Sequence, residues 1–310
     1  MKILVTGAAG FIGSHLVETL LAAGHQVTGF DNFSTGKKKH LSRADGQVGF
    51  RFVEGDICDA ELVDRLVAGQ DFIYHLCDNS DIQFAARHPE VYVSQNIVAG
   101  TRLLDSMVKH GVKKIAFPSS TTVIGDAKVV PTPESYGPLE PMNLYGGAKL
   151  AMEGMLSAYA YTYGLQTWIY RFVGIIGGRM DHGVLHDFVQ KLKDNPQELA
   201  ILGDGSQRRS FVLVDDCVRA MVTAVERFDQ KVNLVHIGNR DHIDISTVAQ
   251  LICETLGYKG VEFKYAGGKR GWVGDALTNF LKCDSLDSIG WYPELDSSGA
   301  VREAARRLHS

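Results

Sequence analysis

The sequence predicts an α/β fold in which a Rossmann-type, doubly wound parallel sheet is joined to a smaller C-terminal lobe. Three observations support this prediction. Short apolar segments alternate with helical periodicity from the N-terminus to Arg171. A glycine motif stands directly between the first apolar segment and the first helical one. Beyond Arg171 the alternation becomes irregular and glycines are frequent. Strands that recur between helices favour a parallel sheet with helices on both faces.

The elements of the sheet follow one another in order. The predicted strands are residues 3–5, 26–30, 48–53, 71–76, 112–117 and 166–171. The predicted helices between them are residues 11–23, 61–67, 91–110 and 144–163. The first helix places Ile12, Leu16 and Leu20 on one face and ends before Gly24, a residue type common just after helix ends. Later in the chain we expect helices over 184–193 and 216–228, and strands over 211–214 and 232–237.

The change in pattern also predicts a division into domains. Residues 1–173, together with about 211–257, are assigned to the sheet domain. Residues from about 174 to 210 and from 258 to 310 are assigned to the smaller lobe.

Composition excludes several classes of protein. The net charge of −4 with dispersed lysines and arginines argues against a nucleic-acid surface. Five cysteines without a CxxC pair argue against a disulfide framework and a structural zinc site. No apolar run approaches the ~20 residues of a membrane span, and Lys2 leads straight into the glycine motif without a signal peptide. We therefore expect a cytoplasmic protein.

The glycine motif predicts a site for a dinucleotide. Gly7, Gly10 and Gly13 have the spacing GxxGxxG at the first strand-to-helix turn. Glycines there let the backbone approach a pyrophosphate, and the helix N-terminus, with Phe11 and Ile12, offers backbone N–H groups. The alternative is a tight turn that binds no ligand.

Two acidic residues extend this site. Asp31 ends the second strand, where a carboxylate accepts hydrogen bonds from ribose hydroxyls and repels a 2′-phosphate, which favours NAD over NADP. The lysines at 37–39 could weaken that preference. Asp56 follows the third strand and is interpreted either as an adenine contact, with Ile57 as an apolar wall, or as a helix N-cap.

A tyrosine and a lysine form the predicted proton-transfer pair. Tyr145 and Lys149 are four residues apart and share one helix face. A tyrosine with a pKa near ~10 is a poor base at neutral pH, and a neighbouring ammonium would favour its phenolate. Ser120 and Thr121 end the fifth strand, at the sheet edge where ligands bind, and Ser120 is the first choice for a proton shuttle. The alternative for Tyr145 is an aromatic side chain that only packs on an amphipathic helix, and the alternative for Ser120 and Thr121 is a turn.

These motifs together resemble the extended short-chain dehydrogenase/reductase family, and within it the UDP-galactose 4-epimerases. The resemblance spans nearly the whole chain. It rests on TGAAGFIGSHL at 6–16, DNFSTG at 31–36, GDI at 55–57, HL at 75–76, SSTTVIGD at 119–126, YGGAK at 145–149, GDGSQRRSFVLVDD at 203–216 and RGWVGD at 270–275.

The resemblance implies an NAD-dependent reaction on a nucleotide-activated sugar, most readily a UDP-sugar, with the smaller lobe binding substrate. Tyr145 would take the proton of the sugar 4-hydroxyl, while hydride passes from C4 to NAD and returns to the other face of a 4-keto sugar. Ser120 would bridge substrate and Tyr145, and Lys149 would tune Tyr145 and hold the cofactor ribose. The other implied cofactor residues are Asn32 and Leu76, and the other implied substrate residues are Thr121, Arg209, Phe211, Arg270 and Asp275.

Four positions depart from the family pattern. Ile124 stands where a tyrosine is common, and Gly174 stands where a substrate-facing asparagine is usual. Cys77 and Asp78 replace a small apolar pair beside the expected nicotinamide. These differences leave the sugar, and the choice among related reactions, open. Cys77 itself is interpreted as a small buried thiol rather than a nucleophile.

Rival functions follow from the same scaffold. A 4,6-dehydratase would need an acidic pair just after the fifth strand, where this chain has Thr121 and Thr122 and no acid before Asp126. A decarboxylase is disfavoured because it would also need an acid at this place. A 4-keto-sugar reductase is disfavoured by Asp31, because this residue favours NAD over NADP. The remaining rival is a non-catalytic NAD-binding scaffold.

Two further expectations concern partners and metals. Related enzymes pair helices equivalent to 91–110 and 144–163 across a dimer axis, so we expect a homodimer, helped by Val98, Leu103, Met155 and Leu156. His182 and His186 could present two metal ligands on a helix, but no third ligand is in view, and we expect no metal.

Overall fold

The structure is a computed structural model that describes residues 1–80 and 82–309. The chain forms two compact units, both discontinuous in sequence. The first unit comprises 1–120, 143–171 and 221–235, and the second 121–142, 172–220 and 236–310. Of the stretch 211–257, which we assigned to the sheet domain, the first unit includes 221–235.

A seven-stranded sheet carries the fold, in the order β11-β6-β5-β4-β1-β2-β3. Strand β1 pairs in parallel with β2 and β4, β2 with β3, and β4 with β5. The predicted Rossmann-type α/β class is confirmed. Winding reverses between β1 and β4, the point at which such sheets bind ligands beyond the carboxyl ends of their strands.

The elements up to β6 are β1 (Lys2–Thr6), α1 (Phe11–Ala22), β2 (Gln26–Asp31), η1 (Lys38–Leu41), β3 (Phe50–Glu54), α2 (Ala60–Val67), β4 (Phe72–His75), α3 (Ile82–Arg87), α4 (Pro89–Val91), η2 (Tyr92–Val98), α5 (Ala99–His110), β5 (Lys114–Ser120), η3 (Thr121–Val123), α6 (Leu144–Tyr163) and β6 (Gln166–Phe172). The elements that follow are β7 (Gly174–Ile176), α7 (Val184–Asp194), β8 (Glu198–Ile201), β9 (Arg208–Arg209), β10 (Phe211–Leu213), α8 (Val214–Arg227), β11 (Val232–Ile237), β12 (Ile243–Asp244), α9 (Ile245–Leu256), β13 (Glu262–Tyr265), β14 (Thr278–Asn279), α10 (Asp284–Ser288) and α11 (Ser297–His309).

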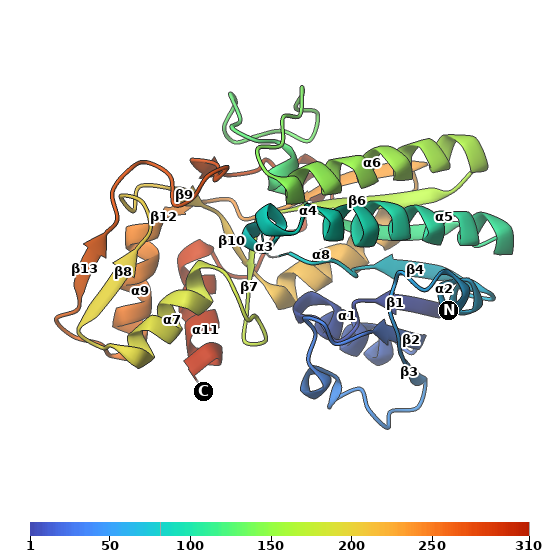
Figure 1. Cartoon of the computed structure of the whole chain (residues 1–310), viewed down its shortest axis with the longest axis horizontal. Helices are drawn as coiled ribbons and strands as arrows, with labels where there is room; N and C mark the ends of the chain where they lie inside the picture. Colours follow the sequence, from blue (N-terminus) through green and yellow to red (C-terminus); the bar gives the residue numbers. More distant parts are fainter. Residues whose placement is uncertain (81, 310) are drawn as a thin grey trace. The chain divides into compact units, whose positions relative to one another are not determined.

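Helices cover both faces of the sheet in the first unit. Helices α5 and α6 run side by side along one face, and α1 lies on the other (Figure 1). The helix predicted over 91–110 is present, but its residues 92–98 form a stretch of π-helix, η2, between α4 and α5. This widened turn buries the polar side chain of Asn96, which has a partner described below.

Apolar side chains between these helices and the sheet form the core of the first unit. Leu103 and Leu156, which we expected at a dimer interface, are both fully buried in this core. Burial of such side chains stabilises the fold by about 1.5–3 kcal/mol each. They hold α5 and α6 against the sheet and are not available to a partner.

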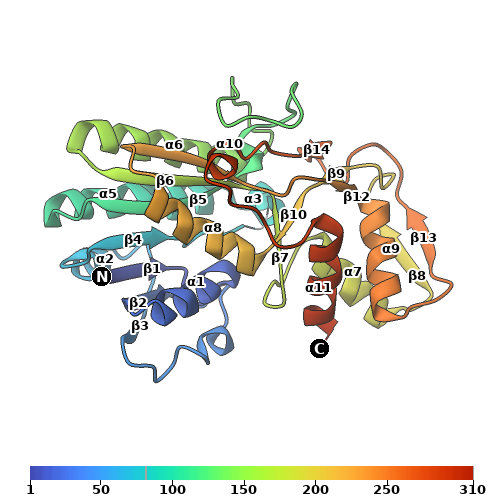
Figure 2. The ribbon, with the colours of Figure 1, turned by 180° about the vertical axis from the view of Figure 1, so that it is seen from behind.

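The second unit has a core of its own, built on helices α7, α9 and α11 (Figure 2). The sequence analysis did not predict α9 and α11. Helix α9 is capped by Asp244, whose carboxylate accepts from Thr247 N at 2.7 Å, and it ends at Gly257 with φ +79°. Within the residues that the structure describes, none of the helices is long and apolar enough for a membrane span. The cytoplasmic location stays a prediction.

Candidate active site

The glycine turn between β1 and α1 lies at the carboxyl edge of the sheet in the first unit. Gly7 adopts φ +70°, and its N–H donates to the Phe30 carbonyl at 2.8 Å, which ties the turn to β2. A Cβ on Gly7 would lie 2.7 Å from the backbone of Leu76, and one on Gly13 would collide with the Gly7 carbonyl oxygen. Glycine is therefore required at both positions.

The N-terminus of α1 is open to an anion. Gly10 is its N-cap and makes no side-chain hydrogen bond to the helix. Phe11 and Ile12 begin the helix, so their N–H groups have no intrahelical acceptor. A pyrophosphate is the type of group that such a helix end binds, and the turn leaves no Cβ in its way. The predicted cradle residues are thus brought together and fit a dinucleotide.

Asp31 braces this turn from the end of β2. Its Oδ2 accepts from Ala9 N at 2.9 Å, and its Oδ1 accepts from Phe33 N at 2.8 Å. Burial raises the pKa of Asp31, while these backbone donors act in the opposite direction. The carboxylate therefore stands beside the dinucleotide turn, where we expected it.

Asn32 and Asp56, both predicted cofactor residues, meet at the ends of β2 and β3. Asn32 Nδ2 donates to Asp56 Oδ2 at 3.0 Å, and Asp56 Oδ1 accepts from Cys58 N at 2.8 Å. The N-cap of α2 is Asp59, so the alternative interpretation of Asp56 as a helix cap is wrong. Ile57 is 4 % exposed and packs into the core of the unit, so most of its side chain faces inward.

The predicted catalytic trio is assembled by β5 and the first turns of α6. Asn143 caps α6 by accepting from Gly146 N at 2.8 Å, and Tyr145 follows in the first turn. Tyr145 is hydrogen-bonded to Ser120 at the end of β5. Lys149 lies one turn further, and its ammonium is 5.6 Å from the centre of the Tyr145 ring.

The electrostatics of Tyr145 differ from our expectation of an acidic phenol. The pKa of Tyr145 is raised well above its ordinary value, first by burial and then by the negative charge of Asp78. The hydrogen bond from Ser120 acts in the opposite direction. Asp78 Oδ2 lies 2.6 Å from Lys149 Nζ, so the ammonium is paired with a carboxylate. Lys149 therefore does not by itself make Tyr145 acidic.

A buried ion pair, which was not predicted from the sequence, holds α6 to the sheet. Glu153 on α6 accepts from Arg171 on β6, through Nε at 3.0 Å and a terminal guanidinium nitrogen at 2.7 Å. Ser119 Oγ donates to the same carboxylate at 2.5 Å. Since Glu153 is one turn beyond Lys149 and Ser119 precedes Ser120, this cluster fixes both elements of the trio. The position of Glu153, four residues after Lys149 on the same helix, was the signal in the sequence that could have indicated it.

Three of the predicted substrate residues come together in the second unit. Arg209 on β9 donates to Asp275 Oδ1 at 2.6 Å, and Arg270 donates to the backbone carbonyl of Asp275. Arg270 also pairs with Asp126. Two guanidinium groups and two carboxylates thus form one cluster, and the guanidinium groups have the shape that diphosphates bind.

The remaining predicted substrate residues are buried. Phe211 is 2 % exposed, and its ring packs against Gly174, where a Cβ would lie 2.8 Å from the ring. The departure at Gly174 therefore has a packing reason, and a nucleotide contact of Phe211 stays a prediction. Thr121 is 6 % exposed at the start of η3, and Ile124 is a core residue of the same unit.

The histidine pair and Cys77 do not form further sites. Helix α7 begins at Val184, so His182 precedes it and is not on one helix face with His186, contrary to our expectation. No group of three or more possible metal ligands occurs among the described residues. Burial raises the pKa of the Cys77 thiol, which favours its protonated form.

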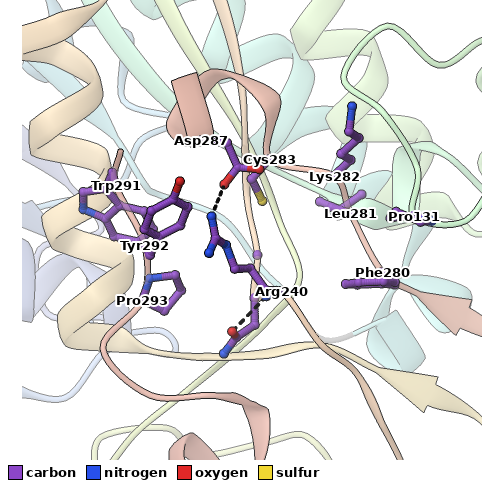
Figure 3. A pocket seen from close by; sticks show the side chains of 12 residues that line it. Pro131, Arg240, Phe280, Leu281, Lys282, Cys283, Asp287, Trp291, Tyr292 and Pro293 are labelled. Carbon is purple, nitrogen blue, oxygen red and sulfur yellow. Dashed lines mark hydrogen bonds and ion pairs between the residues drawn. The ribbon is translucent and has the colours of Figure 1, made fainter. Parts of the chain in front are cut away.

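A separate pocket lies in the second unit and includes none of the predicted site residues (Figure 3). Arg240 projects into it, stacks on Tyr292 with its guanidinium 3.2 Å from the ring centre, and pairs with Asp287 at 3.5 Å. The Arg240 guanidinium is thus already engaged by an aromatic ring and an acid.

Comparison with known proteins gives consistent findings. A sequence profile described as the NAD dependent epimerase/dehydratase family matches residues 3–238. A protein of Methanocaldococcus jannaschii named putative UDP-glucose 4-epimerase is 30 % identical over an alignment of 306 residues, which covers 97 % of this chain and 96 % of that protein.

Solved structures are also similar over almost the whole chain. The UDP-glucose 4-epimerase of Thermotoga maritima, solved with UDP-glucose, is 31 % identical with a TM-score of 0.89, covering 99 % of this chain and 98 % of that one. The dTDP-glucose 4,6-dehydratase of Streptomyces venezuelae, solved with NAD, is 28 % identical with a TM-score of 0.91, covering 99 % and 96 %.

Proposed function

The chain belongs to the NAD-dependent epimerase/dehydratase family, and from this membership we propose that it is a nucleotide-sugar 4-epimerase that acts on UDP-sugars of the glucose and galactose type. Its cofactor is NAD. The observation that carries the proposal is the trio in the first unit, in which Tyr145 is hydrogen-bonded to Ser120 and has Lys149 one turn away. The relatives named as UDP-glucose 4-epimerases support the substrate class.

Each member of the trio has a part in the proposed reaction. Tyr145 Oη takes the proton of the sugar 4-hydroxyl and later returns it to the same oxygen, after C4 has been inverted. Ser120 Oγ hydrogen-bonds the substrate oxygen and Tyr145, so the proton has a short path. NAD, when bound, would supply the acceptor and donor of the C4 hydride. Lys149 would hold the cofactor ribose through its ammonium.

The cradle and the arginine cluster have binding roles. Gly7, Gly10 and Gly13, with the N-terminus of α1, hold the cofactor diphosphate, and Asp31 accepts from the adenosine ribose. Arg209 and Arg270 hold the substrate diphosphate. Because the diphosphate carries the charge, an uncharged keto sugar can turn over while the rest of the substrate stays bound.

The surroundings of Ser120 favour epimerisation over dehydration. Elimination of water across C5 and C6 needs an acid and a base next to the sugar. The residues after Ser120 are threonines, and the first acid, Asp126, is engaged by Arg270. A dehydratase remains the second candidate because the Streptomyces venezuelae enzyme has a similar structure.

A panel of UDP-, dTDP-, GDP- and CDP-sugars, with products identified by NMR, tests this function. Inversion at C4 without net consumption of NADH is the expected result with a UDP-hexose. Loss of water or net use of NADH would replace the proposal with a dehydratase or a reductase. Tyr145→Phe should reduce the rate by about 10²–10⁴-fold while NAD binding is kept.

We also propose that the enzyme is a homodimer through the η2–α5 region and α6. Val98 is 39 % exposed, and Tyr161 on α6 is 70 % exposed. Exposed apolar side chains on neighbouring helices are typical of an interface. Light scattering at micromolar concentration should give twice the monomer mass, and a monomer would contradict this assembly.

A further inference from the structure

Asp78 is a buried acid that the proposed reaction does not use. It follows β4, in the first unit, and its side chain is 10 % exposed. Its Oδ2 lies 2.6 Å from Nζ of Lys149, a lysine whose side chain is 3 % exposed. Burying two charges costs free energy that a surface pair does not incur, so such a pair calls for an explanation.

A second element fixes the same carboxylate. Asn96, in the π-helical turn η2, is 5 % exposed, and its Nδ2 donates to Asp78 Oδ1. Both oxygens of Asp78 therefore have a partner, one on η2 and one on α6. A π-helical turn is often found where a side chain must be placed for function. Here it places the amide that holds Asp78.

The pair also orients the lysine. An ammonium has three N–H donors. Among the described residues, Pro118 O accepts one at 2.6 Å and Asp78 accepts another, which leaves one for a ligand. The ammonium lies 5.6 Å from the centre of the Tyr145 ring and 4.5 Å from that of Phe117. Lys149 can therefore present its last donor in one direction only.

We propose that Asp78 is a positioning residue for the Tyr145–Lys149 pair. Its carboxylate fixes the direction of the Lys149 ammonium and offsets the positive charge of that ammonium beside the Tyr145 phenol. This inference rests on the proposed function, because it concerns the base of that reaction. The charged and polar groups that face Tyr145 come from four elements: Lys149 from α6, Asp78 from beyond β4, Tyr92 from η2 and Ser120 from β5. Asp78 is the acid among them.

Distances in the site set the size of the effect. Asp78 Oδ2 lies 2.6 Å from Nζ, and Nζ lies 5.6 Å from the ring centre, so the carboxylate is within about 8 Å of the ring. At an effective dielectric constant of roughly 20, a unit charge at this distance shifts a pKa by about one unit or more. The direction agrees with the raised pKa of Tyr145.

The test compares Asp78→Asn with the wild-type enzyme, both as full chains loaded with NAD. Asparagine keeps the shape and can still accept from Lys149, but it carries no charge. Phenolate absorption is followed against pH, and the contribution of Tyr145 is obtained by subtracting the same protein with Tyr145→Phe. Thermal unfolding and the NAD content show that each variant is folded. Asp64→Asn is the matched control, because Asp64 is an acid of the same unit that pairs with Lys109.

We expect Asp78→Asn to lower the midpoint of the Tyr145 titration by about one unit or more, while Asp64→Asn leaves it in place. The acid limb of kcat/KM against pH, measured with UDP-galactose, should move to lower pH by the same amount. A midpoint in Asp78→Asn that is equal to or higher than that of the wild type would overturn the inference. Because the titration needs no substrate, it gives this answer even if UDP-sugars are not turned over.

Discussion

Replacing Arg171 with methionine is expected to destabilise the first unit by about 3–5 kcal/mol, because it leaves a buried carboxylate without its cation. Glu153 is 8 % exposed and Arg171 is 4 % exposed. The guanidinium donates to Glu153 at 3.0 and 2.7 Å, and of the described residues Ser119 would remain as a donor, through Oγ at 2.5 Å. A single hydroxyl cannot replace two charge-assisted hydrogen bonds, each worth about 1.5–3 kcal/mol.

Hydrogen exchange measured on peptides from α6 and β6 gives the free energy of local opening of the two elements that the ion pair joins. The double variant Glu153→Gln/Arg171→Met removes the unpaired charge, so it should be more stable than Arg171→Met alone. The reasoning would be refuted if Arg171→Met changed the opening free energy by less than about 1 kcal/mol, or if the double variant lost the sum of both single effects.

Three further perturbations have defined outcomes. Gly13→Ala should weaken NAD binding by about ten- to a hundredfold, since moving the Gly7 carbonyl away from the new Cβ costs roughly 1–3 kcal/mol. Calorimetry measures this, and Gly154→Ala, which meets no atom within 4 Å, should bind NAD normally. Arg209→Met should raise KM for a UDP-sugar by about tenfold or more with kcat largely kept, and an unchanged KM would remove Arg209 from the substrate site. Burial lowers the pKa of His75 to about 3 in the folded protein, against ~6.5 when unfolded. The unfolded chain therefore binds a proton that the folded one does not, and stability falls as pH falls from ~6.5 towards 3. His75→Gln should flatten this part of the urea-denaturation curve against pH, and a curve of unchanged slope would count against it.

The features that the sequence predicted well are those set by local geometry. Gly7 and Gly13 are required by a backbone that turns back on itself, so their spacing alone indicates the cradle. Tyr145 and Lys149 share a helix face because of the helix period, and Ser120 lies near them because it ends a strand at the same edge of the sheet. The alternation of strand and helix segments likewise indicates the parallel sheet.

The features that the sequence analysis missed depend on which groups meet across the fold. Nothing in the spacing of Asn96 and Asp78 shows that a π-helical turn will join them, because the pairing depends on tertiary contacts. The effect of Asp78 on Tyr145 was missed for the same reason. Helix α9 is different: Asp244 and Gly257 mark both its ends, and this signal was present but not used.

The interleaving of the two units has a consequence for biosynthesis. The chain passes from one unit to the other after residues 120, 142, 171, 220 and 235. An emerging polypeptide can therefore complete the first unit only after the ribosome has translated β11. Until then the flank of β6 that pairs with β11 is an uncovered strand edge, so the nascent enzyme passes through an aggregation-prone stage that a chain with consecutive domains would avoid.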